Sequence, residues 1–355
     1  MSQKIINGDS AAVLKQFASD SIDAVITDPP YGIEFLGKEW DQDTGAIDIW
    51  RECLRVLKPG GHLLAFSAAR TYHHLATNVE SVGFEIRDQL MWIYASGFPK
   101  AQDIGKAIDK RGVANEWHGW KTALKPAHEP IVMARKPFKG STTDNVLEHG
   151  VGALNIDATR IESTPERIAE VRRINAAGGL PAADGIDKYG TIGEANRNKR
   201  QQYQLAEGRY PSNVVGEIAD YQKYFYCPKV SRRERHRGFE QQNIPTNPEG
   251  MYAVDGTGVQ YNSNKYKAVG NNHPTVKPVA LMRYLIKLVT PAGAHILDPF
   301  SGSGSTGMAC KELARGFTGI DLDGHYCEIA EKRIAATQEL KTETLFDPQQ
   351  AEPKA

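Results

Sequence analysis

The sequence predicts an α/β fold built on a mostly parallel sheet, and three observations support this class. Short apolar runs alternate with amphipathic stretches through the first 135 residues and again after residue 278, which is typical of strands connected by helices. Residues 22–27 are almost entirely apolar, as expected of a strand covered on both faces. Late in the chain, an apolar run leads through glycines into a helical stretch, as in other open α/β sheets.

Seven strands are predicted from the apolar runs. They are residues 4–7, 22–27, 62–67, 85–94, 130–135, 295–298 and 317–322. Because helical stretches lie between most of them, we expect mainly parallel neighbours with helices on both faces of the sheet.

Helical periodicity predicts the connecting segments. The predicted helices are residues 8–17, 47–57, 75–82, 278–289, 304–313 and 326–337. The second of these is expected to bury Ile47, Trp50, Leu54 and Leu57 on one face, and it should end where Pro59 precedes two glycines.

Composition excludes several classes of protein. The 43 Lys and Arg residues balance 43 Asp and Glu, so no net charge attracts nucleic acid or an anionic membrane, and any basic patch must be local. No run approaches the roughly 18 apolar residues of a membrane-spanning helix, and no leader-like segment is visible, so we expect a cytoplasmic protein without membrane contact. The four cysteines form neither a disulfide framework nor a ligand pattern, and no metal is expected.

Residues 139–272 differ in composition from the rest of the chain. Periodic apolar patterns give way there to Gly, Asn, Ser, Arg and Tyr, and a structureless loop of that length is improbable inside a compact domain. We therefore expect an irregular inserted region between two halves of one domain, at 1–138 and 273–337, with a disordered tail at 338–355. Residues 197–237 carry ten Lys or Arg against four Asp or Glu, interleaved with tyrosines, and form the local basic patch.

The late strand at 295–298 opens into a loop that can approach a ligand closely. Asp298 begins this loop, and Gly302 and Gly304 let its backbone come near a nucleotide-like cofactor. About 20 residues further on, Asp321 ends the next strand, where a carboxylate can accept hydrogen bonds from both hydroxyls of a ribose. Enzymes that bind NAD share this arrangement, so the loop alone leaves an NAD-dependent oxidoreductase open.

The early strand at 22–27 ends in Asp28, Pro29, Pro30 and Tyr31. The two prolines stiffen the loop and remove two N–H donors, so the loop presents acceptors. The Asp28 carboxylate and the Pro29 carbonyl can accept both protons of an exocyclic amino group while the Tyr31 ring stacks on the heterocycle.

The central prediction places these two loops in one crevice. In open α/β sheets, ligands bind beyond the carboxyl ends of the strands at the point where the strand order reverses. If strands 22–27 and 295–298 flank that point, Asp28 and Asp298 meet although 270 positions separate them.

With these two motifs, the sequence resembles the DNA amino-methyltransferases, which use S-adenosylmethionine to methylate adenine N6 or cytosine N4. The order of the motifs, with DPPY before the glycine loop, is similar to that of the permuted beta class. The resemblance implies a seven-stranded, Rossmann-like methyltransferase sheet with one reversed strand, and an inserted target-recognition region. It favours adenine as the target base and implies in-line methyl transfer to a base extruded from the duplex.

The resemblance also assigns residues to roles. Asp28, Pro29, Pro30 and Tyr31 are implied to hold the target base. The NGD element at 7–9, the HPTVKP element at 273–278 and the glycine loop are implied to hold the cofactor. The implied cofactor-binding residues are Asn7, Gly8, Asp9, Asp28, Thr275, Lys277, Asp298, Pro299, Phe300, Gly302, Ser303, Gly304, Asp321 and Leu322.

Candidate contacts to the base and to DNA come from aromatic and basic residues. They are Trp92, Tyr94 and Phe98 for the extruded base, and Lys229, Arg232, Arg233 and Arg235 for phosphates and base edges. Double-stranded DNA is the expected partner. A homodimer and a cognate restriction endonuclease are partners that the sequence neither requires nor excludes.

Several alternatives to adenine methylation stay open. They are N4-cytosine methylation, a DNA-binding module without catalysis, an NAD-dependent oxidoreductase and, as a variant, methylation of RNA. Methylation of cytosine carbon 5 needs a nucleophilic cysteine, typically one that follows a proline, and none of the four cysteines follows one.

Overall fold

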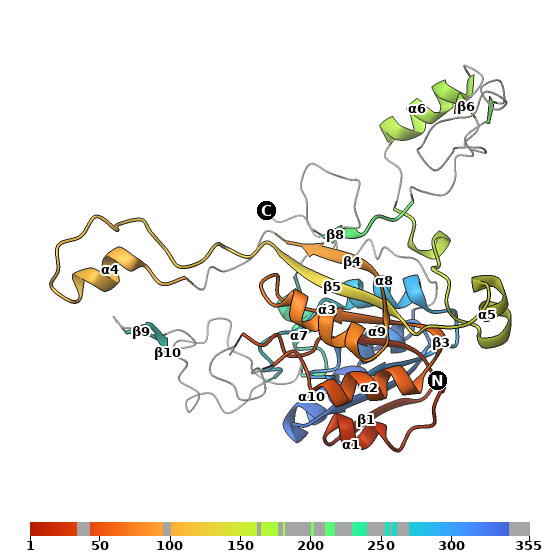
Figure 1. Ribbon diagram of the computed structural model, residues 1–355, viewed down its shortest axis with the longest axis horizontal. Coiled ribbons are helices and arrows are strands. Elements are labelled where there is room, and N and C mark those ends of the chain that lie inside the picture. The colour runs from red at the N-terminus through yellow and green to blue at the C-terminus, as the bar shows by residue number, and fades with distance from the viewer. Residues whose placement is uncertain are drawn as a thin grey trace.

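An eight-stranded sheet forms the centre of the computed structural model (Figure 1). Its order is β1-β12-β11-β2-β3-β5-β4-β8. The strands are β1 (Gln3–Asn7), β2 (Ile22–Thr27), β3 (Leu57–Phe66), β4 (Glu85–Ile93), β5 (His128–Arg135), β8 (Val214–Gly216), β11 (His295–Asp298) and β12 (Gly316–Asp321). The structure describes residues 1–33, 43–94, 101–161, 165–176, 180–181, 200–201, 210–216, 229–239, 253–255, 258–260 and 270–340.

The predicted fold class is confirmed. All seven predicted strands are present, and the sheet is parallel except for β5, which runs antiparallel to β3 and to β4. The eighth strand, β8, comes from the middle region and pairs in parallel with β4 at the edge of the sheet. With three residues, it is too short to leave a periodic signal in the sequence.

Helices cover both faces of the sheet. One face packs on α1 (Ser10–Leu14), α2 (Ile47–Val56) and α3 (Tyr72–Ser81), and the other packs on α8 (Val279–Val289) and α9 (Ser305–Glu312). Strand β2 lies between these two cores, since Ala24 and Ile26 contact the α8 side and Val25 contacts the α2 side. This double burial explains why β2 is apolar throughout.

The remaining elements include α10 (Gly324–Ala335), which packs against β1, β12 and α9. The others are α4 (Ile104–Asp109), α5 (Thr142–His149), a 3-10 helix (Asp157–Thr159), α6 (Pro165–Ala176), α7 (Arg232–Arg235), β6 (Leu180–Pro181), β7 (Arg200–Gln201), β9 (Ala253–Asp255) and β10 (Gly258–Gln260). The middle region starts with a regular helix, α5. The Asn145 side chain of α5 donates a hydrogen bond to the Pro59 carbonyl in β3. The boundaries of the predicted inserted region stay predictions.

Two helix predictions need correction. The first helix is shorter than 8–17 and covers only Ser10–Leu14. The second ends at Val56, because Leu57 is already extended and begins β3, so the Pro-Gly-Gly segment lies inside a strand. Its buried face is also different, since Ile47 is 37% exposed while Ile49 and Cys53 are buried beside Trp50.

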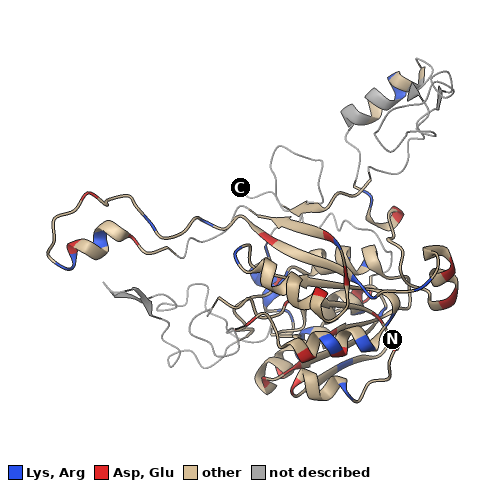
Figure 2. Ribbon diagram, viewed as in Figure 1, with Lys and Arg blue, Asp and Glu red and all other residues tan. Residues whose placement is uncertain are grey.

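An arm at residues 101–127, between β4 and β5, projects away from the sheet and carries α4 (Figure 1). Trp117 and Trp120 are exposed on it, with their rings 5.2 Å apart. Basic and acidic residues are interspersed over the described ribbon rather than separated into two halves (Figure 2), in keeping with the balanced composition. Among the described residues, no helix is long and apolar enough to cross a membrane.

Candidate active site at the centre of the sheet

The two predicted loops lie side by side. Strands β2 and β11 pair in parallel, with Ala24 opposite Ile296 and Val25 opposite Leu297. The residues that follow them therefore leave the sheet at the same edge, and the Thr27 hydroxyl donates a hydrogen bond to Asp298 Oδ1 at 2.6 Å. From these two central strands the chain crosses over in opposite directions, which is the expected position of a ligand site.

Asp298 fixes the shape of the glycine loop. Its carboxylate is buried and accepts hydrogen bonds from the hydroxyls of Thr27 and Thr306, each at 2.6 Å, and from the Phe300 backbone N–H at 3.1 Å. Burial raises the pKa of Asp298 to about 6, and these hydrogen bonds oppose the rise. Because both carboxylate oxygens accept hydrogen bonds from the protein, this side chain holds the loop in shape.

The glycines of this loop are required by backbone shape and by close packing. Gly302 and Gly304 have φ values of 50° and 78°, a region that other residues rarely adopt. A Cβ on Gly302 would lie 2.7 Å from His273 Nε2, and one on Gly307 would lie 2.4 Å from Ile334 Cδ1. Since these three glycines have the G-x-G-x-x-G spacing that dinucleotide-binding loops also use, the pattern alone does not separate a methyltransferase from a dehydrogenase.

Asp321 joins the glycine loop to the NGD element. Its Oδ2 accepts the Gly302 N–H at 2.7 Å, and Asn7 donates to the carbonyls of Asp321 and Leu322 at 3.0 and 2.9 Å. Burial raises the pKa of Asp321. Asp9 caps α1 through the Ala12 N–H. The three predicted cofactor-binding segments near Asn7, Gly302 and Asp321 are thus held together by hydrogen bonds.

Beyond the end of β2, four polar side chains form a cluster, which we call the Asp28 cluster: Asp28, Tyr31, Glu129 and Lys277. The Tyr31 hydroxyl donates to Asp28 Oδ1 at 2.8 Å and lies 3.1 Å from Glu129 Oε2. The Lys277 ammonium donates to Asp28 Oδ2 and lies 3.4 Å from Glu129 Oε2. The Lys277 side chain is only 7% exposed.

Burial and charge set the protonation states in this cluster. Burial raises the pKa of Asp28, while the Lys277 ammonium opposes the rise and Glu129 adds to it. Burial alone would lower the pKa of Lys277, but Asp28 and Glu129 outweigh it and the pKa is raised. Burial, together with both carboxylates, holds the pKa of Tyr31 well above its usual 10, so its hydroxyl stays protonated and can donate.

Glu129 is the member of the cluster that sequence reasoning missed. It lies in the phrase LKPAHEP, just before the predicted strand at 130–135, whereas β5 begins at His128. Because β5 is the reversed strand, it begins at the edge of the sheet where the parallel strands end. An acidic residue at the start of a reversed strand is therefore the signal that could have identified Glu129.

A comparison with protein families identifies the chain. The family model described as DNA methylase, of the N6 and N4 type, matches residues 22–332. The chain belongs to this family. It is therefore a DNA amino-methyltransferase of the N6-adenine or N4-cytosine type, and S-adenosylmethionine, the methyl donor of the family, is its cofactor. Family membership removes the NAD-dependent oxidoreductase that the glycine loop had left open.

Individual relatives are distant but span nearly the whole chain. The type II methyltransferase M.HindIII of Haemophilus influenzae is 25% identical, with 93% of this chain and 94% of that protein covered. The DNA adenine methyltransferase YhdJ of Escherichia coli is 24% identical, with 96% and 85% covered. Among solved structures, the cytosine-N4-specific PvuII DNA methyltransferase is 14% identical, with 94% and 86% covered and a TM-score of 0.48.

The residues of this DNA amino-methyltransferase fit S-adenosylmethionine. The glycine loop follows the central strand β11 with a left-handed backbone at Gly302 and Gly304, and the Asp321 carboxylate lies beside it at the end of β12. The HPTVKP element packs onto the same loop through His273, which contacts Gly302. Lys277, implied to bind the cofactor, contacts Asp28 and Glu129 here, and its role toward the cofactor stays a prediction.

Of the predicted base contacts, Trp92 and Tyr94 both lie buried in the same hydrophobic core cluster. Trp92 is 2% exposed and belongs to the hydrophobic core, with its ring 5.0 Å from that of Tyr94. Burial and the nearby Glu129 carboxylate raise the pKa of Tyr94, and the Lys229 ammonium lies 3.9 Å from the centre of the Tyr94 ring. Tyr94 and Lys229 are thus brought to the Asp28 cluster, while Phe98 lies outside the described residues.

The predicted DNA-binding arginines divide into two groups. Arg235 donates to the His273 carbonyl at 2.7 Å, and the neighbouring Glu234 accepts the first N–H of α8, that of Val279. Arg235 therefore helps to hold the HPTVKP element in place. Arg232 and Arg233 are exposed at the surface of the same short helix, and their contact with DNA stays a prediction.

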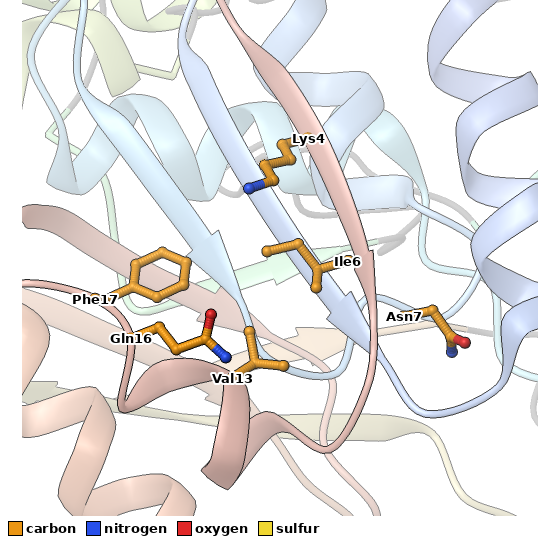
Figure 3. A pocket seen from close by; sticks show the side chains of 6 residues that line it. All are labelled: Lys4, Ile6, Asn7, Val13, Gln16 and Phe17. Carbon is orange, nitrogen blue, oxygen red and sulfur yellow. The ribbon is translucent and has the colours of Figure 1, made fainter.

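A separate pocket lies at the outer edge of the sheet, beside β1 and α1 (Figure 3). Its lining residues are Lys4, Ile6, Asn7, Val13, Gln16 and Phe17. Asn7 connects it to the cofactor side of the site, but it includes no member of the Asp28 cluster. No group of residues that could hold a metal ion is found within the described part of the chain.

Proposed function

We propose that this protein methylates the N6 amino group of an adenine extruded from double-stranded DNA. The observation that carries the proposal is the position of Asp28, which follows a central strand and lies next to the glycine loop through Thr27 and Asp298. The likeness of this chain to a DNA adenine methyltransferase over 96% of its length favours adenine.

The residues around Asp28 suit the chemistry of an exocyclic amine. Such a nitrogen is a poor nucleophile because its lone pair is delocalised into the ring, and hydrogen bonds from its protons to Asp28 and to the Pro29 carbonyl favour a pyramidal nitrogen. S-adenosylmethionine supplies the methyl group as an electrophilic sulfonium. Asp28, Pro29 and the Tyr31 ring then orient the amine, and positioning provides most of the acceleration.

A covalent intermediate on cysteine has no support among the described residues. Burial raises the pKa of the Cys53 and Cys310 thiols, and it raises that of Cys327 to about 11, so these thiols stay protonated and are poor nucleophiles. Cys227 lies outside the described residues.

Extrusion of the base costs a few kcal/mol of stacking and pairing, and contacts to the duplex must offset this cost. We propose that the exposed arginines of α7 supply part of them. A homodimer and a partner restriction endonuclease remain predictions, the latter favoured by relatives that are named type II methyltransferases.

The test is methyl transfer followed by identification of the product. Purified protein, tritiated S-adenosylmethionine and duplex DNA should give labelled DNA, and sequencing of DNA from expressing cells should show N6-methyladenine at one short site. N4-methylcytosine at that site would contradict adenine and show that cytosine is the target base. Binding of duplex DNA without incorporation of label would contradict catalysis, and label in RNA alone would contradict DNA as the substrate.

A further inference from the structure

In this structure Lys277 occupies the oxygen that the target amine needs. Its ammonium hydrogen-bonds to Asp28 Oδ2, and the Tyr31 hydroxyl occupies Oδ1. The side chains of Asp28 and Lys277 are 17% and 7% exposed, so this is a pair with little access to water. The target amine, which donates one proton to Asp28 and the other to the Pro29 carbonyl, has to compete at Asp28 with a charged donor, and a charge-assisted hydrogen bond is stronger than a neutral one. Capture of the base is therefore favoured when Lys277 leaves Asp28.

Lys277 cannot simply be released into its surroundings. Its ammonium lies 5.5 Å from the centre of the Tyr31 ring and 5.0 Å from that of the Phe66 ring. Breaking a buried ion pair and leaving one charge without a partner is strongly unfavourable. An ammonium that gives up Asp28 therefore needs a second anion within reach.

Glu129 is that second anion. Its Oε2 lies 3.4 Å from the Lys277 ammonium and 3.1 Å from the Tyr31 hydroxyl, so the two groups that now bind Asp28 both reach Glu129 with small movements. The backbone of Glu129 is held by pairing with β4, where Glu129 lies opposite Trp92, and β5 is paired with β3 as well from Ile131 onward. Its side chain is 16% exposed.

We propose that Glu129 is a positioning residue that accepts Lys277 and Tyr31 from Asp28 when the target base enters the site. Asp28 is then free to bind the amino group, and the ammonium keeps an anionic partner throughout. The exchange rests on the proposed role of Asp28 but not on the identity of the base, since adenine N6 and cytosine N4 present the same two protons.

Glu129→Gln tests the exchange, because it keeps the size of the side chain and removes its charge. Lys277 then has Asp28 as its better partner and competes with the base. We expect the KM for duplex DNA to rise about 10- to 100-fold, since the competent state becomes rare, while kcat at saturating DNA changes much less. The fluorescence of 2-aminopurine at the target position, which reports unstacking, should fall in parallel.

The double variant Glu129→Gln/Lys277→Met separates this exchange from simple damage. Removing Lys277 removes the competitor, so base extrusion and the KM for DNA should return toward wild-type values at saturating S-adenosylmethionine. Glu85→Gln, on the neighbouring strand and paired with Arg135 at the far end of β5, is the matched control and should behave as wild type.

Three outcomes would overturn the proposal. They are a Glu129→Gln variant with a wild-type KM for DNA, a variant that loses kcat rather than affinity, and a double variant no better than Glu129→Gln. If Glu129→Gln does not fold, the single variant Lys277→Met tests the proposal. The proposal requires that 2-aminopurine is extruded by Lys277→Met at least as well as by wild type, and weaker extrusion would contradict it. The wild-type protein is assayed first. If it transfers no methyl group to DNA, the result contradicts the proposed function and not the exchange at Glu129.

Discussion

At the scale of single residues, the site consists of acidic side chains with different surroundings and different tasks. Asp298 is enclosed by hydroxyls and a backbone N–H, and it shapes a loop. Asp28 lies against an ammonium and a phenol that both also contact Glu129. The sequence presents both as an Asp-Pro pair after an apolar run, and only their neighbours distinguish them.

Replacing Asp28 should separate chemistry from cofactor binding. We expect Asp28→Ala to lower methyl transfer by at least about 10³-fold, because the amine loses its main acceptor, while calorimetric affinity for S-adenosylmethionine stays within a few-fold of wild type. Asp48→Ala, on the exposed surface of α2, is the control. Substantial activity in Asp28→Ala would contradict the assigned role.

Asp298 should make stability depend on pH. Its pKa is raised from 3.8 to about 6 in the folded protein, so the folded state binds this proton more tightly than the unfolded state does. The resulting stabilisation is complete below pH 3.8 and is lost as the pH rises through 6, by about 3 kcal/mol for a shift of this size. The asparagine in Asp298→Asn does not ionise and escapes this loss.

Urea unfolding of wild type and Asp298→Asn at pH 4.5 and 7.5 measures the effect. The free energy of unfolding of the variant should improve relative to wild type by about 2 kcal/mol or more between the two pH values. A difference that stays constant with pH would show that Asp298 has an ordinary pKa.

At the scale of elements, the glycine loop and the helix that follows it are the most constrained part of the site. Gly302 combines a left-handed backbone with contact to His273, whereas Gly112 has a similar φ of 70° but nothing within 4 Å of its missing Cβ. This pair separates backbone strain from crowding.

Gly112→Ala should therefore cost only the backbone strain, about 1 kcal/mol. Gly302→Ala should cost more, about 2–4 kcal/mol, and should also weaken binding of S-adenosylmethionine, because His273 and the HPTVKP element must move. Thermal unfolding and calorimetry check both variants. An equal loss of stability in the two variants would show that the contact with His273 does not contribute to the loss.

Helix α7 should contribute to DNA binding through its exposed side. We expect Arg232→Ala/Arg233→Ala to weaken duplex affinity and to reduce the slope of log K against log salt by about 2, as for the loss of two phosphate contacts. Arg235 is left intact because it holds the His273 carbonyl. Arg51→Ala/Arg87→Ala, at two exposed positions elsewhere, is the control, and an unchanged slope in the α7 variant would exclude this helix from the interface.

The elements also show which sequence signals are reliable. Strands with long apolar runs were predicted well because burial on two faces leaves a composition that few other structures share. The buried face of α2 was predicted wrongly, since its polar and apolar residues allow two overlapping stripes and tertiary packing selected Ile49 and Cys53 over Ile47. Short elements such as β8 depend on pairing with a neighbour and have no local signal.

At the scale of the whole molecule, the sheet order was the prediction on which the others depended. We placed β2 beside β11 because the loop after β2 suits a target amine and the loop after β11 suits the methyl donor, and the two must meet for transfer. The structure confirms that pairing. Glu129 could not be found in this way, because recognising it requires knowing which strand is reversed. The arm at 101–127 was also missed, since irregular segments carry no periodicity.

The pairing of β2 with β11 also determines when, during translation, the active site can form. During translation Asp28 leaves the ribosome early, but the strand beside it appears only when residue 295 has been synthesised. A polypeptide that ends before residue 295 contains β2 without β11, so it lacks the glycine loop and cannot methylate DNA. Modification of DNA in a cell therefore requires chains that extend beyond β11, and we expect nonsense mutations upstream of residue 295 to abolish it.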